Sequence, residues 1–161
     1  MLLVAAAVIL RTRPSGKASE LEPRISALAG SSMMYVIVLF PRRELSRSLE
    51  MISTALILIG TVGAVLGAAQ LGCSFSVMAE TRQLVIAGPY RFVRHPLYLT
   101  EQIATFGLFM QFASAWTALV LALQIAFQLR RMHNEELMLT ASFPEYVAYR
   151  QNITGLIPGV Y

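Results

Sequence analysis

Long runs of apolar residues alternate along this chain with short polar segments. The clearest run is Met51–Gly72, because a helix crosses the hydrocarbon core of a bilayer with about 20 apolar residues. Its spacing Gly63-x-x-x-Gly67 would let a neighbouring helix approach closely. The run Ile25–Phe40 is shorter, and Met1–Leu10 would form a helix of only about 15 Å. This pattern predicts a helical membrane protein.

The last apolar run, residues 97–129, is too long for one crossing. As a single helix it would extend about 50 Å, whereas the hydrocarbon layer is about 30 Å thick. A small and polar break, residues 111–115, lies near its middle. We therefore predict a helical hairpin that returns Arg130 and the C-terminal segment to the side on which the run begins. The expected fold is all-α and polytopic, with about five transmembrane helices including this C-terminal hairpin.

The chain is predicted to be a single integral membrane domain, 1–161. Residues 1–72 would hold the N-terminal spans and 73–96 a cytosolic loop, followed by the hairpin at 97–129 and a cytosolic C-terminal segment at 130–161. This arrangement places ten Lys and Arg residues on the cytosolic side and three, Arg42, Arg43 and Arg47, on the other. The excess agrees with the positive-inside rule.

Composition supports the membrane assignment. Hydrophobic residues make up 56% of the chain and charged residues only 14%, whereas soluble domains carry about 25% charged residues. The basic residues lie between or beyond the apolar runs, so they indicate membrane topology and no nucleic-acid partner is expected. The single Cys73 excludes an intramolecular disulfide and a cysteine-built zinc site, and no metal site is expected.

The candidate chemistry lies in three polar clusters on the predicted cytosolic face, the first of which is Arg82-Gln83-Leu84-Val85. Residues 88–98 hold two Tyr, two Arg and one His next to apolar sequence, and residues 131–136 hold an Arg, a His and two Glu. Arg131 and Glu135 share a helix face, so a solvated helix end with an ion pair is an alternative interpretation. Glu101 lies one turn inside an apolar segment and should face the bundle interior, with Arg94 or Arg131 as its partner.

These clusters, in their order and spacing, resemble the isoprenylcysteine carboxyl methyltransferase family, which looks related to the phospholipid methyltransferases. The resemblance runs from Leu71 to Pro158. It is carried by Leu84-Val85-x-x-Gly88-Pro89-Tyr90-x-x-Val93-Arg94-His95-Pro96-Leu97-Tyr98, the apolar hairpin, Arg131-x-x-x-Glu135-Glu136-x-x-Leu139, and Phe143 followed by Tyr146-x-x-Tyr149. It implies methyl transfer from S-adenosylmethionine in a cytosolic cofactor cleft.

Carried over by position, the resemblance assigns roles to individual residues. Arg131 aligns with a family arginine that meets the acceptor, and it is the candidate catalytic residue. Arg82 stands where the family commonly has a His, and Phe143-Pro144-Glu145 replaces the usual glycine after the Phe. The residues expected to contact S-adenosylmethionine are Arg82, Gln83, Leu84, Val85, Tyr90, His95, Pro96, Leu97, Tyr98 and Glu135.

The expected function is S-adenosylmethionine-dependent methylation of a carboxylate on an isoprenylcysteine-like or other lipophilic acceptor. A carboxylate is already a nucleophile and needs only a cation such as Arg131 to position it. An amine of a phospholipid head group is the alternative acceptor, with Glu136 or His133 as the candidate helper, and a non-enzymatic membrane subunit is a third possibility. The expected partners are a lipophilic or lipidated acceptor and membrane lipid, in a bacterial inner membrane with the active site facing the cytosol.

Overall fold

The computed structural model describes residues 16–17, 30, 32–71, 80–81 and 84–156. The expected first span Met1–Leu10, all of residues 18–29, and Arg82 and Gln83 lie outside these ranges. In chain order the elements are β1 (Gly16–Lys17), η1 (Met33–Leu39), α3 (Arg47–Leu71), β2 (Glu80–Thr81), η3 (Gly88–Arg91), α4 (Pro96–Gln111), α5 (Ala115–Ser142) and α6 (Tyr146–Asn152). The architecture is α-helical, as predicted, and within the described ranges β1 and β2 form one short antiparallel pair.

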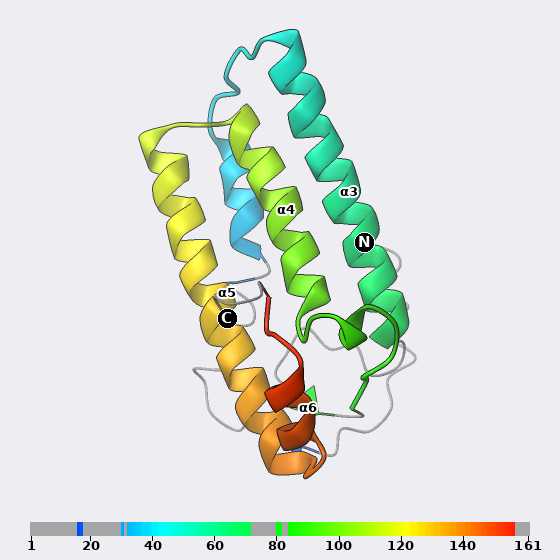
Figure 1. Cartoon of the computed structure of the whole chain (residues 1–161). Coiled ribbons are helices and arrows are strands. Elements are labelled where there is room, and N and C mark those ends of the chain that lie inside the picture. The colour runs from blue at the N-terminus through cyan, green and yellow to red at the C-terminus, as the bar shows by residue number, and fades with distance from the viewer. Residues whose placement is uncertain (1–15, 18–29, 31, 72–79, 82–83, 157–161) are drawn as a thin grey trace.

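The predicted hairpin is confirmed. Helix α4 ends at Gln111 and α5 begins at Ala115, and the two run in opposite directions (Figure 1). Ser114 and Thr117 cap the start of α5: the Thr117 N–H donates to Ser114 Oγ at 3.1 Å, and the Ser114 N–H donates to Thr117 Oγ1 at 2.8 Å. Such a reciprocal cap satisfies amide groups that a helix start leaves unpaired.

Helix α5 continues well beyond the apolar run. Its 28 residues extend about 42 Å, so the segment 130–142 belongs to the same helix as the second hairpin leg. This continuity fixes the rotation of Arg131 and Glu135 relative to Gln124 and Gln128, since all four lie on one rigid element.

Glycines allow α3 and α4 to pack closely, as the Gly63-x-x-x-Gly67 spacing predicted. A Cβ atom at Gly60 would lie 2.4 Å from the backbone N of Ala104, and one at Gly63 would lie 2.5 Å from Thr100 Cγ2. Real Cβ atoms essentially never come so close, so the two backbones are in direct contact there. The beginning of α4 is therefore held in a fixed position against α3.

Many of the buried side chains are polar, whereas many large apolar side chains are exposed on the surface. The buried residues of α5 are almost all polar, Gln124 and Gln128 among them, whereas Trp116 and Leu119 on the same helix are exposed. Burial of polar groups beneath an apolar surface is typical of a membrane bundle. Among the described residues, one helix is long and apolar enough to cross a membrane, α3 over Arg47–Gln70, with a mean hydropathy of 2.1. The expected five spans remain a prediction.

Candidate functional site

The loop before α4 is shaped by a glycine and held by the C-terminal segment. Gly88 has a positive φ of 62°, a backbone conformation that residues with a side chain rarely adopt. Further along, the backbone N–H of Arg94 donates to the carbonyl of Thr154 at 2.8 Å, and that of His95 donates to the carbonyl of Gly155 at 3.1 Å. The loop therefore pairs with residues about 60 positions later, which fixes where His95 begins α4.

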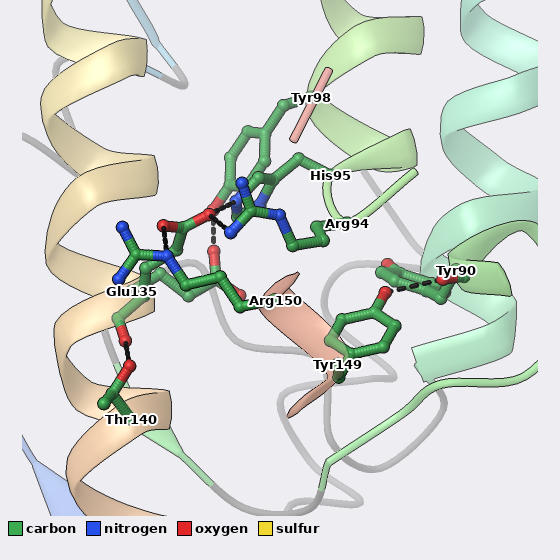
Figure 2. A network of polar contacts seen from close by, with 9 residues as sticks. Tyr90, Arg94, His95, Tyr98, Glu135, Thr140, Tyr149 and Arg150 are labelled. Carbon is green, nitrogen blue, oxygen red and sulfur yellow. Dashed lines mark hydrogen bonds and ion pairs between the residues drawn. The ribbon is translucent and has the colours of Figure 1, made fainter. Parts of the chain in front are cut away.

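A tyrosine on α6 adds a third connection to this loop. The hydroxyl of Tyr149 donates to the carbonyl oxygen of Tyr90 at 2.5 Å (Figure 2). Burial, opposed by the charge of Arg94, raises the pKa of Tyr149 to about 12. The hydroxyl therefore stays protonated at neutral pH and remains a donor. Tyr90 itself is buried, so the hydrogen bond from α6 reaches the loop at a residue that is packed inside the protein.

Glu136 is the centre of an ion cluster that joins α5 to the loop before α4 and to α6. Its Oε1 lies 2.8 Å from Arg94 Nη1 and 3.0 Å from His95 Nε2, and its Oε2 lies 3.4 Å from Arg150 Nε. The Glu136 side chain is 3% exposed. Burial alone would raise the pKa of this carboxyl group, but the hydrogen bond to His95 and the charges of His95, Arg94 and Arg150 lower it to below its ordinary value. Glu136 is thus held as a carboxylate.

Glu135, the next residue along the helix, faces a different neighbour. Its Oε2 accepts a hydrogen bond of 2.6 Å from the hydroxyl of Tyr98 on α4. The guanidinium carbon of Arg131 lies 4.8 Å from the centre of the Tyr98 ring, within the range of a cation–π interaction. The His95 ring stands 5.4 Å from the same ring. The two adjacent glutamates therefore lie in different surroundings: Glu136 belongs to the ion cluster, and Glu135 contacts Tyr98.

A file of polar side chains leads from Tyr98 further along the α4–α5 interface. Gln128 Nε2 donates to Glu101 Oε2 at 3.2 Å, and Gln124 Nε2 donates to Gln128 Oε1 at 3.4 Å. Glu101 faces the bundle interior, as predicted, and interacts electrostatically with Arg131. Arg94, the other predicted partner, forms its ion pair with Glu136 instead.

The structure brings most of the sequence-predicted site residues to one end of the hairpin. His95, Tyr98, Arg131 and Glu135 lie in a connected group. Leu97 packs against α3, where Gly67 leaves room for it. Among the others, Tyr90 and Pro96 are buried, Leu84 and Val85 are half-buried, and Arg82 and Gln83 lie outside the described residues.

Sequence reasoning missed the residues that hold this group in place. From the sequence, Glu136 has a role only as a candidate helper for an amine acceptor, and Arg150 and the carbonyls of Thr154 and Gly155 have none. Helical register was the available signal, because Glu135 and Glu136 are adjacent on a helix and must point about 100° apart. Only one of them could face Tyr98.

Fold and site together define a class: a helical protein of the membrane type, with a polar, tyrosine-lined site at one end of a helical hairpin. Comparison of the sequence with known families agrees with this. The chain matches the model of the isoprenylcysteine carboxyl methyltransferase (ICMT) family over residues 52–141, more than half of its length, and it belongs to that family. The family is described as one of carboxyl methyltransferases.

Two curated relatives carry names from metal resistance. The chain is 30% identical over 110 residues to the nickel-cobalt-cadmium resistance protein NccN of Alcaligenes xylosoxydans xylosoxydans, an alignment covering 66% of this chain and 52% of the relative. It is 29% identical over 110 residues to the cobalt-zinc-cadmium resistance protein CzcN of Cupriavidus metallidurans, covering 66% and 51%. The chain thus spans about half the length of these relatives. Within its described ranges, no three His, Cys, Asp or Glu residues are grouped to hold a metal ion.

Proposed function

We propose that this chain is an integral membrane methyltransferase that uses S-adenosylmethionine. The observation that carries the proposal is the Tyr98–Glu135 pair beside Arg131, at the end of a hairpin whose outer surface is apolar. ICMT family membership supports it, since methyltransferases of this family use that cofactor in general. We place the protein in a bacterial inner membrane with the site facing the cytosol, from which a water-soluble cofactor would enter.

The side chains around Tyr98 suit the groups of the cofactor. Glu135 is half-buried, and its carboxylate can accept from the cofactor's ammonium or a ribose hydroxyl. The rings of Tyr90 and Tyr98 offer aromatic surface to adenine. His95 is already bonded to Glu136 through Nε2, so its proposed role is to hold the start of α4 beside the cofactor. When bound, S-adenosylmethionine supplies an electrophilic methyl group on a sulfonium.

The protein's contribution to this reaction is positioning. Methyl transfer from a sulfonium is an in-line displacement, so the site must orient the acceptor and exclude water. The predicted acceptor is the carboxylate of an isoprenylcysteine-like or other lipophilic molecule, which Arg131 would hold through its planar guanidinium. Such an acceptor would reach the site from the bilayer. A second candidate, an amine acceptor, is favoured by the position of Glu101 beside Arg131.

Binding of S-adenosylhomocysteine to the detergent-solubilised protein tests the proposal, by titration calorimetry. We expect Glu135→Ala to weaken binding by about tenfold or more, because it removes a charged hydrogen bond to the cofactor. We expect His95→Ala to weaken binding as well, because it releases the start of α4 from Glu136. Glu145→Ala, an exposed position at the start of α6, is the matched control and should bind as the parent does. Equal affinity in all the variants would place the cofactor elsewhere. No binding to the parent protein would favour the non-enzymatic alternative.

A further inference from the structure

Glu101 is a carboxylate that the cofactor site described above does not use. It lies on α4 one turn beyond Tyr98, where the helix surface is apolar, and it is half-buried toward α5. An ionisable group within a membrane bundle costs several kcal/mol unless it is paired, and it commonly marks a substrate path. Gln128 donates to its Oε2. A carboxylate has about four acceptor positions, so Glu101 has the capacity to bind a further donor.

The charges around Glu101 decide which donor it can take. Arg131 interacts electrostatically with Glu101 and Glu135 and stacks on Tyr98. Among these groups there is one cation for two carboxylates. Of the other described cations near the loop, Arg94 and Arg150 are engaged by Glu136, and Arg91 is exposed. Among the charged groups that act on Glu101, Arg131 is therefore the one cation, and it is shared with the Glu135 carboxylate.

This balance disfavours an anionic acceptor. A substrate carboxylate that took Arg131 as its partner would leave Glu101 charged and without its counterion in apolar surroundings, and removing one partner from a buried pair is strongly unfavourable. An acceptor with an N–H group keeps the Arg131–Glu101 interaction intact. It also adds a charge-assisted hydrogen bond to Glu101.

We propose that Glu101 is a specificity-determining residue that selects an amine on a lipophilic molecule as the methyl acceptor. The inference rests on the proposed function and names the substrate class of the same site. The file of Gln128 and Gln124 beyond Glu101 would bind further polar atoms of the acceptor's head group, while its apolar part stays in the bilayer.

The chemistry of such a transfer is complete with the groups named. The neutral amine nitrogen uses its lone pair to form the new C–N bond as the methyl carbon–sulfur bond breaks, and that bond's electron pair stays on sulfur. The nitrogen then carries a positive charge and passes a proton to the Glu101 carboxylate. The products are a neutral methylated amine, S-adenosylhomocysteine and a protonated Glu101, which returns the proton to water at the rim.

The test uses membranes from cells that overproduce the full chain, supplied with S-adenosylmethionine radiolabelled in its methyl group. We expect label above the empty-vector control to enter the lipid extract and to survive mild base, as an N-methyl group does. A methyl ester would release the label as methanol under the same treatment. Base-labile label with normal S-adenosylhomocysteine binding would overturn the amine assignment alone. Failure of that binding would overturn the proposed function as well.

Glu101→Gln gives a second test, because it keeps the shape of the side chain and removes the charge. We expect base-stable labelling to fall by about tenfold to a hundredfold, while S-adenosylhomocysteine affinity stays as in the parent. Normal affinity also shows that the variant is folded. The control is Glu44→Gln, an exposed glutamate in the loop between η1 and α3, which should label as the parent does. Unchanged labelling in Glu101→Gln would refute the role of this carboxylate.

Discussion

The ion cluster around Glu136 makes the sharpest prediction about how this site is held together. Glu136→Gln keeps the size of the side chain but leaves Arg94 and His95 facing a neutral group in a buried position. Removing one partner of a buried ion pair costs about 3–5 kcal/mol. The pair with Arg150 adds little, because that side chain is 51% exposed and such pairs are worth about 0–1 kcal/mol. We therefore expect a loss of about 3 kcal/mol.

Thermal unfolding in detergent, followed by circular dichroism, measures this loss. For a chain of this length, about 3 kcal/mol corresponds to a decrease in Tm of about 6–12 °C. Glu145→Gln, an exposed position near the same segment, is the control and should leave Tm unchanged. Glu135→Gln separates the two glutamates: we expect it to weaken S-adenosylhomocysteine binding with a much smaller change in Tm. A Glu136→Gln protein as stable as the parent would refute the account of the cluster.

The same cluster predicts how stability depends on pH. The pKa of Glu136 is lower in the folded protein than its ordinary value. The unfolded chain therefore binds the proton more readily, so the contribution is fully present above the unfolded pKa of about 4.3 and is lost as the pH falls through the folded pKa. Between about pH 5 and pH 3 the parent should lose more stability than Glu136→Gln. Parallel losses in the two proteins would contradict this assignment.

Two further predictions concern how the helices and the loop are packed. Gly60→Ala should lower Tm by about 2–6 °C, because its new methyl group meets the backbone of α4 at 2.4 Å and overpacking costs about 1–3 kcal/mol, partly offset by helix propensity. Gly67→Ala, whose methyl group would have its nearest contact at 3.6 Å, is the control, and a Tm at or above that of the parent is expected. Tyr149→Phe removes the hydrogen bond to the carbonyl of Tyr90 and should lower Tm by about 2–4 °C. Tyr35→Phe, at an exposed tyrosine, should leave Tm unchanged. Equal decreases in Tm for the two tyrosine substitutions would show that the hydrogen bond to the loop does not stabilise the protein.

Much of the fold could be predicted because each feature depends on local chemistry. The hairpin turn was readable from a polar break in an apolar run, and the structure places its cap there, at Ser114 and Thr117. The close approach of α3 and α4 was readable from small residues at helical spacing. The length of α5 was not, because the polarity changes at Arg130 while the helix continues. Hydropathy indicates which parts of a helix lie in apolar or polar surroundings, but it does not indicate where the helix ends.

The candidate site, like the fold, could be predicted from the sequence only in part. Motif order could place Tyr98, His95 and Glu135 at one end of the hairpin, because residues near the start of one leg and the end of the other must meet. It could not pair the backbone of the loop with Thr154 and Gly155. Nearly every residue type has the same backbone carbonyl and amide groups, so this backbone pairing cannot be predicted from the sequence.

The position of this site at the end of a hairpin has a physical basis. A cofactor with several charged groups needs donors and acceptors that would be costly in the hydrocarbon layer, whereas a lipophilic acceptor needs apolar surface. A helix that runs from an apolar region into a polar one supplies both along a single face, as α5 does from Gln124 to Glu135. The α4–α5 interface brings Glu101 and Tyr98 to this face from the other leg. In the proposed function, the charges along this face, rather than Arg131 alone, would determine which acceptor the site binds.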